Sequence, residues 1–225
     1  MADLLNTNTV LAPRAPALPF APVEYDRKYQ DDLSNILRLY FSLQDSAFSS
    51  LFSSVGSRYL RSVYGAFQST ATQTASAINT ATVMTLDQTD ISNEVSVVSS
   101  SKITVANAGT YNLQWSGQFQ NTDIVIQTVY VWLKKTSNGV STDVVGSTRR
   151  SFIAARKSVA AGDEAYVVLG WNDLVELQAT DYVEIWWSTT STAVSLVPQA
   201  AATGPVRPSI ASVLASLTFV SAPLT

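Results

Sequence analysis

The sequence predicts an all-β sandwich or jelly roll of about ten short strands, preceded by an extended arm and one amphipathic helix. Three observations predict it. From residue 62 onward, apolar and polar residues alternate in short runs between Gly, Asn and Asp turn signals, which is typical of half-buried strands. Residues 24–61 repeat their apolar side chains with a helical period, and residues 1–23 are rich in proline. We therefore expect an arm over 1–23, a helix over 24–61 and a β head over 62–225.

Composition excludes several classes of function. Only 14% of the 225 residues are charged, and the formal net charge of -3 does not favour binding to a phosphate backbone, so we expect no nucleic-acid partner. The chain has no Cys and no His, which excludes disulfides, thiolate nucleophiles, histidine bases and the usual zinc sites. We expect no cofactor. Without a membrane-spanning run or a signal peptide, we expect synthesis in the cytoplasm and no membrane insertion.

The arm carries a proline at every third position near its end. Polyproline II has three residues per turn, so these rings would lie along one edge of a stiff segment that rises about 3.1 Å per residue. Such a segment has no core of its own. It is either a disordered leader or an anchor that becomes ordered in a groove on another protein. The expected anchoring residues are Pro13, Pro16, Pro19, Phe20 and Pro22.

A helical period replaces the proline period from Glu24 to about Ser54. Apolar residues recur by four and three, the a/d spacing of a heptad, and a second apolar row lies beside them. The helix either packs on its own β domain or forms a short self-association bundle; two adjacent rows favour the bundle. The expected trimer helix residues are Tyr29, Leu33, Ile36, Leu37, Tyr40 and Leu43.

The first half of the β region is organised around residues 109–119. Strand side chains alternate, so Tyr111, Leu113, Trp115 and Phe119 share one face of this strand, and Gly117 marks a bulge or a close backbone approach. Shorter strands are expected at 63–67, 81–86, 95–98 and 102–105, with a loop over 69–80.

The second half begins with a run, 124–133, that is apolar on both strand faces. Ile124, Ile126, Tyr130 and Trp132 lie on one face, and valines with Leu133 lie on the other. Such a strand is interior to a sandwich or shared with a partner subunit. The segment 134–139 ends in Asn-Gly, the strongest short hairpin signal. Further strands are expected at 165–177, 182–189 and 210–220, with a loop over 198–208.

Several of these runs resemble a known superfamily. Gly109-Thr110-Tyr111, Val131-Trp132-Leu133-Lys134-Lys135, Asp181-Tyr182-Val183-Glu184-Ile185 and Leu217-Thr218-Phe219 are similar to the globular heads of the complement-one-q and tumour-necrosis-factor superfamily. With the leader over 25–29 and 35–40, the chain resembles small virion proteins of tailed bacteriophages that carry such a head. The resemblance covers roughly residues 20–220. It departs at Thr180, where the family usually has Gly, and in lacking a collagen-like stem.

The resemblance implies a homotrimer of ten-strand jelly rolls with aromatic strand faces around the threefold axis. The helix would then replace the collagen-like stem as the trimerising element. Large aromatic side chains supply buried area in a core or at an interface, and exposed ones would suggest sugar stacking instead. The expected β-core or trimer interface residues are Tyr111, Leu113, Trp115, Phe119, Tyr130, Trp132, Trp186, Trp187 and Phe219.

Charged residues suggest two further kinds of site. Acidic residues near turns provide carboxylates for glycoside hydrolysis, but their pattern is that of solvated strand ends, so we expect no enzyme. A basic group in a weakly patterned stretch is either a solvated loop or a contact for an anionic host glycan. The acids are Asp163, Glu164, Asp173, Glu176, Asp181 and Glu184; the basic residues are Arg149, Arg150, Arg156 and Lys157.

The function expected from these observations and the resemblance is that of a bacteriophage virion structural protein. A trimeric surface spike or fibre would be anchored to other virion proteins, in the capsid or the tail, through residues 1–60. Its β head would be exposed at the virion surface for adhesion to a host glycan. One alternative is a capsid decoration or cement protein that stabilises the shell, and a second is a polysaccharide-degrading enzyme.

Overall fold

A computed structural model describes residues 14–20, 22–51 and 62–222. Pro13 of the expected anchor and the end of the expected helix region, 52–61, lie outside these ranges. The chain divides into two compact units, Met1–Arg61 and Ser62–Thr225, and each is described by itself.

The N-terminal unit contains one helix, α1 (Arg27–Leu51). Its start is capped by Asp26, because the Lys28 backbone amide donates to Asp26 Oδ1 at 2.8 Å. No side chain of α1 is buried. Most of the expected stripe is half-buried, whereas Leu43 is 63% exposed. In the arm, residues 14–20 form neither helix nor strand, and Phe20 is fully exposed.

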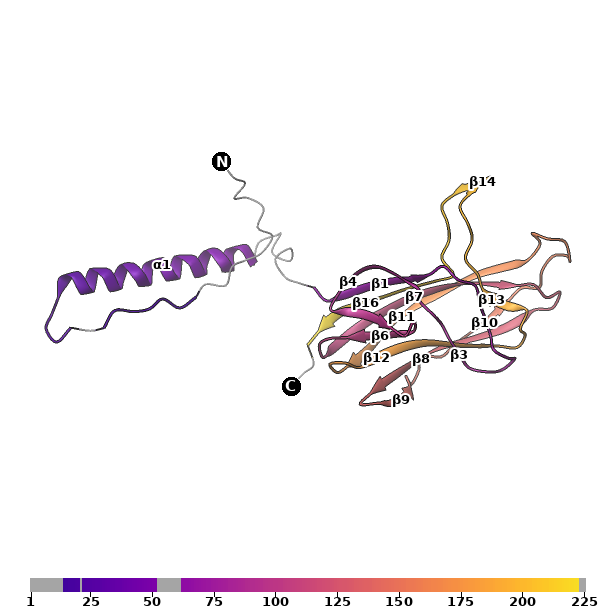
Figure 1. The fold of residues 1–225 in the computed structure, drawn as a ribbon, viewed down its shortest axis with the longest axis horizontal. Helices are drawn as coiled ribbons and strands as arrows, with labels where there is room; N and C mark the ends of the chain where they lie inside the picture. The colour runs from indigo at the N-terminus through magenta and orange to yellow at the C-terminus, as the bar shows by residue number, and fades with distance from the viewer. Residues whose placement is uncertain (1–13, 21, 52–61, 223–225) are drawn as a thin grey trace. The chain divides into compact units, whose positions relative to one another are not determined.

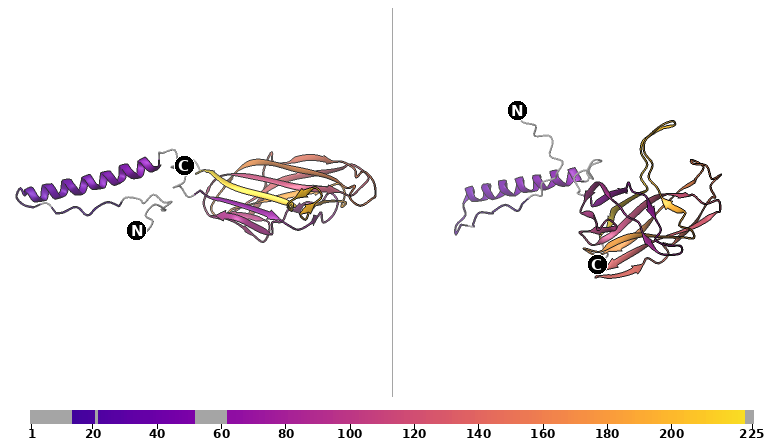
Figure 2. Two further views of the ribbon diagram at one scale, coloured as in Figure 1. Left: turned by 90° about the horizontal axis from the view of Figure 1, so that it is seen from above. Right: turned by 45° about the vertical axis from the view of Figure 1, so that its right-hand side comes forward.

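The second unit is built from two antiparallel sheets that pack face to face (Figures 1 and 2). In sheet A, β11 lies on one edge of β7, and β16 and β13 lie end to end along its other edge; β1 and β4 continue the sheet beyond β16. Sheet A contains β1 (Tyr64–Ser69), β2 (Gln73–Thr74), β4 (Gln88–Asn93), β7 (Gly109–Asn121), β11 (Ala165–Leu177), β13 (Val194–Leu196) and β16 (Val213–Ser221).

Sheet B is centred on a pair of long strands, β8 and β12. Strands β10 and β9 lie end to end along the free edge of β8, and β6 and β3 do the same along β12. A small separate hairpin, β14 (Ala202–Thr203) with β15 (Val206–Arg207), projects from the sandwich (Figure 1). Sheet B contains β3 (Thr82–Val83), β5 (Val95–Val98), β6 (Lys102–Val105), β8 (Gln127–Ser137), β9 (Val140–Asp143), β10 (Arg149–Ile153) and β12 (Tyr182–Thr189).

The connections make this sandwich a jelly roll. The chain crosses from β6 in sheet B to β7 in sheet A and returns to sheet B at β8. It crosses again from β10 in sheet B to β11 in sheet A and returns to sheet B at β12. Its last strand, β16, lies in sheet A. The chain therefore passes repeatedly between the two layers, as in paired Greek keys. The predicted all-β jelly-roll class is confirmed.

The core lies between the inward faces of the two sheets, where the face predicted for residues 109–119 is found. Tyr111, Leu113, Trp115 and Phe119 are all less than 5% exposed. Phe119 packs edge-on against Trp187 of the opposite sheet, with ring centroids 5.6 Å apart. Gly117 is a close approach, as expected: a Cβ there would lie 2.8 Å from Leu196 Cδ2.

Three aromatic residues expected in the core or at the trimer interface lie outside the core. Tyr130, Trp132 and Trp186 are half-buried on the outward face of sheet B. The reason is the two-residue period of a strand: Val129, Val131 and Leu133 take the inward positions of β8, and consecutive residues of β12 point to opposite faces. Phe219 of β16 is half-buried and packs edge-on against Tyr111 at 5.6 Å.

Some predicted element bounds were wrong. The strand expected at 124–133 begins only at Gln127 and continues to Ser137, because the Asn121 side chain holds residues 122–126 in a loop. Of 134–139, only Asn138 and Gly139 form the turn, with the positive φ angles of 49° and 78° that a two-residue hairpin requires. The expected loops at 69–80 and 198–208 contain β2 and the β14–β15 hairpin, and β4 was not predicted.

Candidate functional site

The outward face of sheet A, called face A below, is formed by outward side chains of β1, β7, β11 and β16. No residue of β1, β7 or β16 is charged. The central strand β7 presents five amide or hydroxyl side chains between its inward core residues: Asn112, Gln114, Ser116, Gln118 and Gln120. Face A is therefore neutral across its middle, which makes its desolvation by a protein partner less costly than that of a charged surface.

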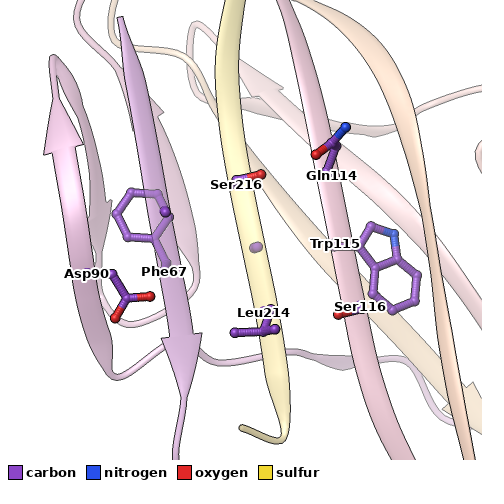
Figure 3. A pocket seen from close by; sticks show the side chains of 9 residues that line it. Phe67, Asp90, Gln114, Trp115, Ser116, Leu214 and Ser216 are labelled. Carbon is purple, nitrogen blue, oxygen red and sulfur yellow. The ribbon is translucent and has the colours of Figure 1, made fainter.

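Face A is hollowed where small side chains meet. A depression of about 350 Å³ lies over β1, β16 and β7, between Asp90 on one side and Gln114 on the other (Figure 3). Ala66, Ser116 and Ser216 line it, and none of these side chains is long enough to fill it. A second depression of about 290 Å³ shares Ser116 and Leu214 with the first, so the hollow continues across the sheet.

The edge strand of face A presents a row of apolar side chains. On β11, Tyr166, Val168 and Leu174 are 45%, 66% and 63% exposed. Tyr166 is fixed by the Gln120 side-chain amide, which donates to its hydroxyl at 2.7 Å. Face A thus combines a neutral hollow over β1, β16 and β7 with an apolar ridge on β11.

The outward face of sheet B, called face B below, has different chemistry. It is formed by outward side chains of β6, β8, β10 and β12, with Asp143 of β9, and is rich in aromatic rings and cations. The Arg150 guanidinium lies over the Phe152 ring at 4.5 Å and the Tyr130 ring at 5.9 Å. The ammonium groups of Lys134 and Lys102 lie 4.9 Å and 5.0 Å from the ring centres of Trp186 and Tyr182. Each of these cations is held over an aromatic ring.

One carboxylate organises the end of face B. The Trp132 indole N–H donates to Asp143 Oδ1 at 2.9 Å, and Lys134 Nζ lies 3.6 Å from the same oxygen. Glu184, the other outward acid, is only 8% exposed and accepts a hydrogen bond from the Ser101 hydroxyl at 2.6 Å.

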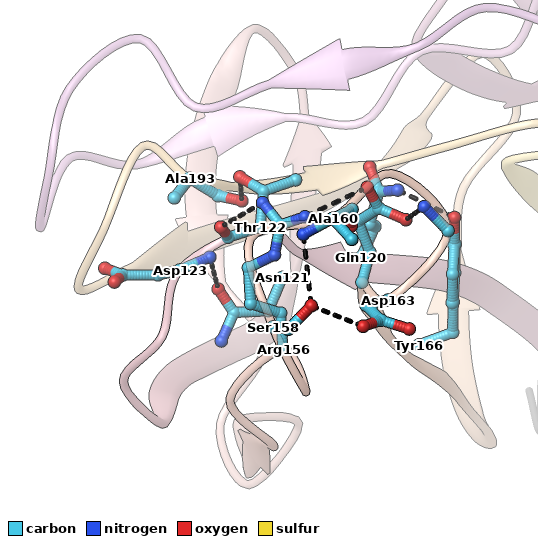
Figure 4. A network of polar contacts seen from close by, with 12 residues as sticks. Gln120, Asn121, Thr122, Asp123, Arg156, Ser158, Ala160, Asp163, Tyr166 and Ala193 are labelled. Atoms are coloured by element: carbon cyan, nitrogen blue, oxygen red, sulfur yellow. Dashed lines mark hydrogen bonds and ion pairs between the residues drawn. The ribbon is translucent and has the colours of Figure 1, made fainter.

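The end of the sandwich formed by loops 122–126 and 154–164 is held by a polar network (Figure 4). Asn121 is fully buried, and its side-chain amide donates to the carbonyls of Val125 and Ala154, both at 2.9 Å. Its side-chain carbonyl accepts from the Asp123 amide, also at 2.9 Å. One side chain therefore fixes both loops.

Arg156 completes this network from the second loop. Its guanidinium donates to the carbonyls of Thr122 and Ala160 and lies 3.5 Å from Glu164 Oε1, with only 13% of its side chain exposed. These contacts join the two loops, although the buried Nε of Arg156 has no hydrogen-bond partner among the described residues. Ile124, Val125 and Ile126 are 57–67% exposed at the tip.

The predicted basic group is dispersed by the fold. Arg149 and Arg150 are adjacent in β10 and point to opposite sides: Arg149 pairs with Asp173 at 3.4 Å and lies over Trp171, whereas Arg150 lies on face B. Arg156 is buried in the loop network, and Lys157 is exposed beside it. The four side chains do not form one surface, and whether any contacts a glycan stays a prediction.

Five of the six predicted acidic residues are engaged in local contacts, and the sixth, Glu176, is exposed on β11. Asp163 accepts from the Ser158 hydroxyl, and Asp181, 3% exposed, accepts from the Gln178 backbone amide at 2.9 Å. Glu164, Asp173 and Glu184 have the partners given above. Within residues 14–20, 22–51 and 62–222, no three His, Cys, Asp or Glu residues are grouped to hold a metal ion.

The surroundings of Tyr111 alter the pKa of its phenol. Burial, followed by the charge of Glu94, raises the pKa of its phenol above the ordinary value of 10.0. The neutral phenol donates to the Asn107 carbonyl at 2.8 Å. No helix in the described part of the chain is long and apolar enough to cross a membrane.

The sequence contained a signal for face A but only a partial one for the stacking on face B. The absence of charge from 64–69, 109–121 and 213–221 can be read directly from the amino-acid sequence, and it marks the three strands that line the hollow. Arg150 and Phe152 are two residues apart in β10, a spacing that can be read from the sequence. The other stacking contacts had no such signal, because they join β10 with β8, β8 with β12 and β6 with β12.

Comparisons with known proteins give no family assignment. No protein-family model matches the chain, and no curated protein matches it. Among solved structures, the Eiger TNF from S. frugiperda is 11% identical, with a TM-score of 0.47 over 74% of this chain and 97% of that chain. We draw no functional argument from this likeness, and the fold assignment depends on the strand order described above.

Proposed function

We propose that this chain is a non-enzymatic bacteriophage virion protein, a homotrimeric surface spike whose N-terminal unit anchors it and whose β unit is exposed for adhesion. The observation that carries the proposal is face A, which is neutral, hollowed and bordered by an apolar ridge. These are the properties of a surface that a second protein copy covers.

The arrangement of face A favours a head-to-tail contact between copies. The first depression lies over β1, β16 and β7, whereas the ridge lies on β11 and borders only the second depression, at Val168. The first depression and the ridge therefore occupy different parts of the same face. If the ridge of one copy fits the hollow of the next, the contact is heterologous, and such contacts give either rings or open filaments. A ring of three copies is the assembly that the resemblance implies.

Helix α1 supports the same assembly. A helix with an apolar stripe and no buried side chain gains most of its stability by packing on a partner. Three parallel copies of α1 would bury the stripe that begins at Tyr29 and Leu33. Three anchoring arms on one trimer would then raise the affinity for the particle through high effective concentration.

The assembly is tested by the mass of the full chain and by one charge placed in the hollow. We expect a species of three times 24.2 kDa. Ser116→Arg buries an unpaired charge, so the trimer dissociation constant should rise at least about a hundredfold. Ser141→Arg makes the same change on β9 in sheet B and should leave the constant unchanged. A wild-type monomer would contradict the trimer, and an unaltered Ser116→Arg trimer would contradict the use of face A.

The virion role is tested by gold-labelled antibodies on intact particles from the producing culture. Label at the tail would support a receptor-binding spike, and label over the capsid would support the alternative of a decoration or head fibre. Removal of residues 1–24 should abolish incorporation. Absence of label from every particle would contradict the virion proposal.

A further inference from the structure

We propose that face B binds an acidic polysaccharide, with Arg150 and Lys102 as its carboxylate contacts and the aromatic rings around them as its sugar contacts. This inference rests on the proposed role of the β unit in adhesion. It assigns the contact to a sheet face that includes Arg150, one of the four basic residues predicted from the sequence, and not to Arg149, Arg156 or Lys157.

The first support is the free charge of these two cations. Three of the six other basic side chains of the unit form ion pairs: Arg149 with Asp173, Arg156 with Glu164, and Lys134 with Asp143. Lys135 and Arg207 donate to backbone carbonyls. Among the hydrogen bonds and ion pairs of residues 62–222, neither the Arg150 guanidinium nor the Lys102 ammonium has an acidic partner. Both side chains lie over aromatic rings, which neutralise no charge.

The second support is the distribution of charge. Face B carries three basic and two acidic side chains, while the rest of residues 62–225 contains five basic and nine acidic residues. One of the two acids, Glu184, is buried and hydrogen-bonded. Face B therefore has a net positive charge on a unit that is otherwise acidic, and it is complementary to a polyanion.

The third support is preorganisation. A lysine or arginine side chain on a protein surface normally loses rotamer freedom when it binds a ligand. Here the rings of Phe152 and Tyr182 already hold the guanidinium and ammonium groups close to the sheet. The flat aromatic surface beside them, with Phe152 59% exposed, suits the apolar C–H face of a sugar ring.

These features together favour a polysaccharide over other polyanions. A nucleic acid would require a larger basic surface than two free cations provide. A linear polyuronate offers a carboxylate and an apolar ring face in every sugar, and so matches both kinds of group on face B. Face A, which lacks free cations, remains available for self-association.

The test measures binding of the full-length chain to alginate, a linear polyuronate, by biolayer interferometry at 50 mM and 500 mM salt. We expect binding that weakens at high salt, and weakens again when the carboxylates are blocked as propylene glycol esters. Arg150→Gln and Lys102→Gln should each weaken binding about tenfold, because each removes one charge-assisted contact. Phe152→Ala should weaken it while leaving the salt dependence intact.

Lys157→Gln is the matched control, because it removes an exposed charge from the predicted basic group without touching face B. Unchanged binding by this variant supports face B. The inference is overturned if wild-type chain does not bind alginate, if esterified alginate binds equally well, or if only Lys157→Gln weakens binding. Mass measurements on the same samples separate the two proposals. A trimer that does not bind alginate refutes only the polysaccharide site on face B. A monomer that binds alginate refutes only the proposed trimer.

Discussion

Replacing Asn121 with Ala should lower the free energy of unfolding by about 3 kcal/mol, at about 1 kcal/mol for each of three lost hydrogen bonds. The side chain is fully buried and bonds to the carbonyls of Val125 and Ala154 and to the amide of Asp123. Val125 is 57% exposed, so water can partly replace the bond to its carbonyl. The expected loss of unfolding free energy therefore includes no further cost for unsatisfied polar groups.

The assay is urea unfolding followed by tryptophan fluorescence, with Asn112→Ala as the control. Asn112 belongs to the same strand, but its side chain points outward and makes a single exposed contact with Asn172. The control should change the free energy of unfolding by less than about 0.5 kcal/mol. If the free energy of unfolding of Asn121→Ala lies within about 1 kcal/mol of the wild-type value, the claim that this residue holds both loops is refuted.

Three further predictions follow from individual contacts. Gly170→Ala should destabilise the chain by about 1–3 kcal/mol, because its Cβ would lie 2.6 Å from the Trp115 backbone oxygen. Gly204→Ala should be neutral, because a Cβ there would have no atom within 4 Å in the described part of the chain. Thermal unfolding of both variants tests this. The raised pKa of Tyr111 means that stability from its neutral phenol is fully present below pH 10.0 and is lost as the pH rises further. Tyr111→Phe should therefore show a smaller fall in urea midpoint between pH 10 and 11 than wild type, and an equal fall would contradict the assignment. Arg156→Gln should speed thermolysin cleavage within loop 154–164 severalfold, because three contacts of the guanidinium are lost. Thermolysin should cleave the Lys157→Gln variant at the wild-type rate.

The two sheet faces differ in chemistry in a way that suits face A to the proposed assembly and face B to the proposed adhesion. Face A lacks charge at its centre, so a copy that covers it does not have to desolvate ions. Face B keeps two cations without acidic partners, and such groups favour a solvated, ligand-accessible surface. A trimer closed through face A would leave face B available on every subunit.

The sequence by itself determined the fold class and the inward face of the central strand. Alternation over residues 109–121 is a local property, because successive side chains of any strand point to opposite faces. The same rule places Trp186 and Trp187 on opposite faces of β12. Strands over 165–177 and 182–189 have the predicted bounds, since clear turn residues delimit them.

Only the tertiary structure decided what lies outside the core. Residues 124–126 are apolar and β-branched, like the strand that follows them, but the side chain of Asn121 and its bond to the carbonyl of Ala154, 33 residues further on, hold the segment in a loop. Likewise, four basic residues close in sequence lie in separate environments, and Lys102 reaches Tyr182 from another strand. Periodicity reports which face a residue occupies, whereas contacts between distant strands depend on register and sheet order, which no local pattern encodes.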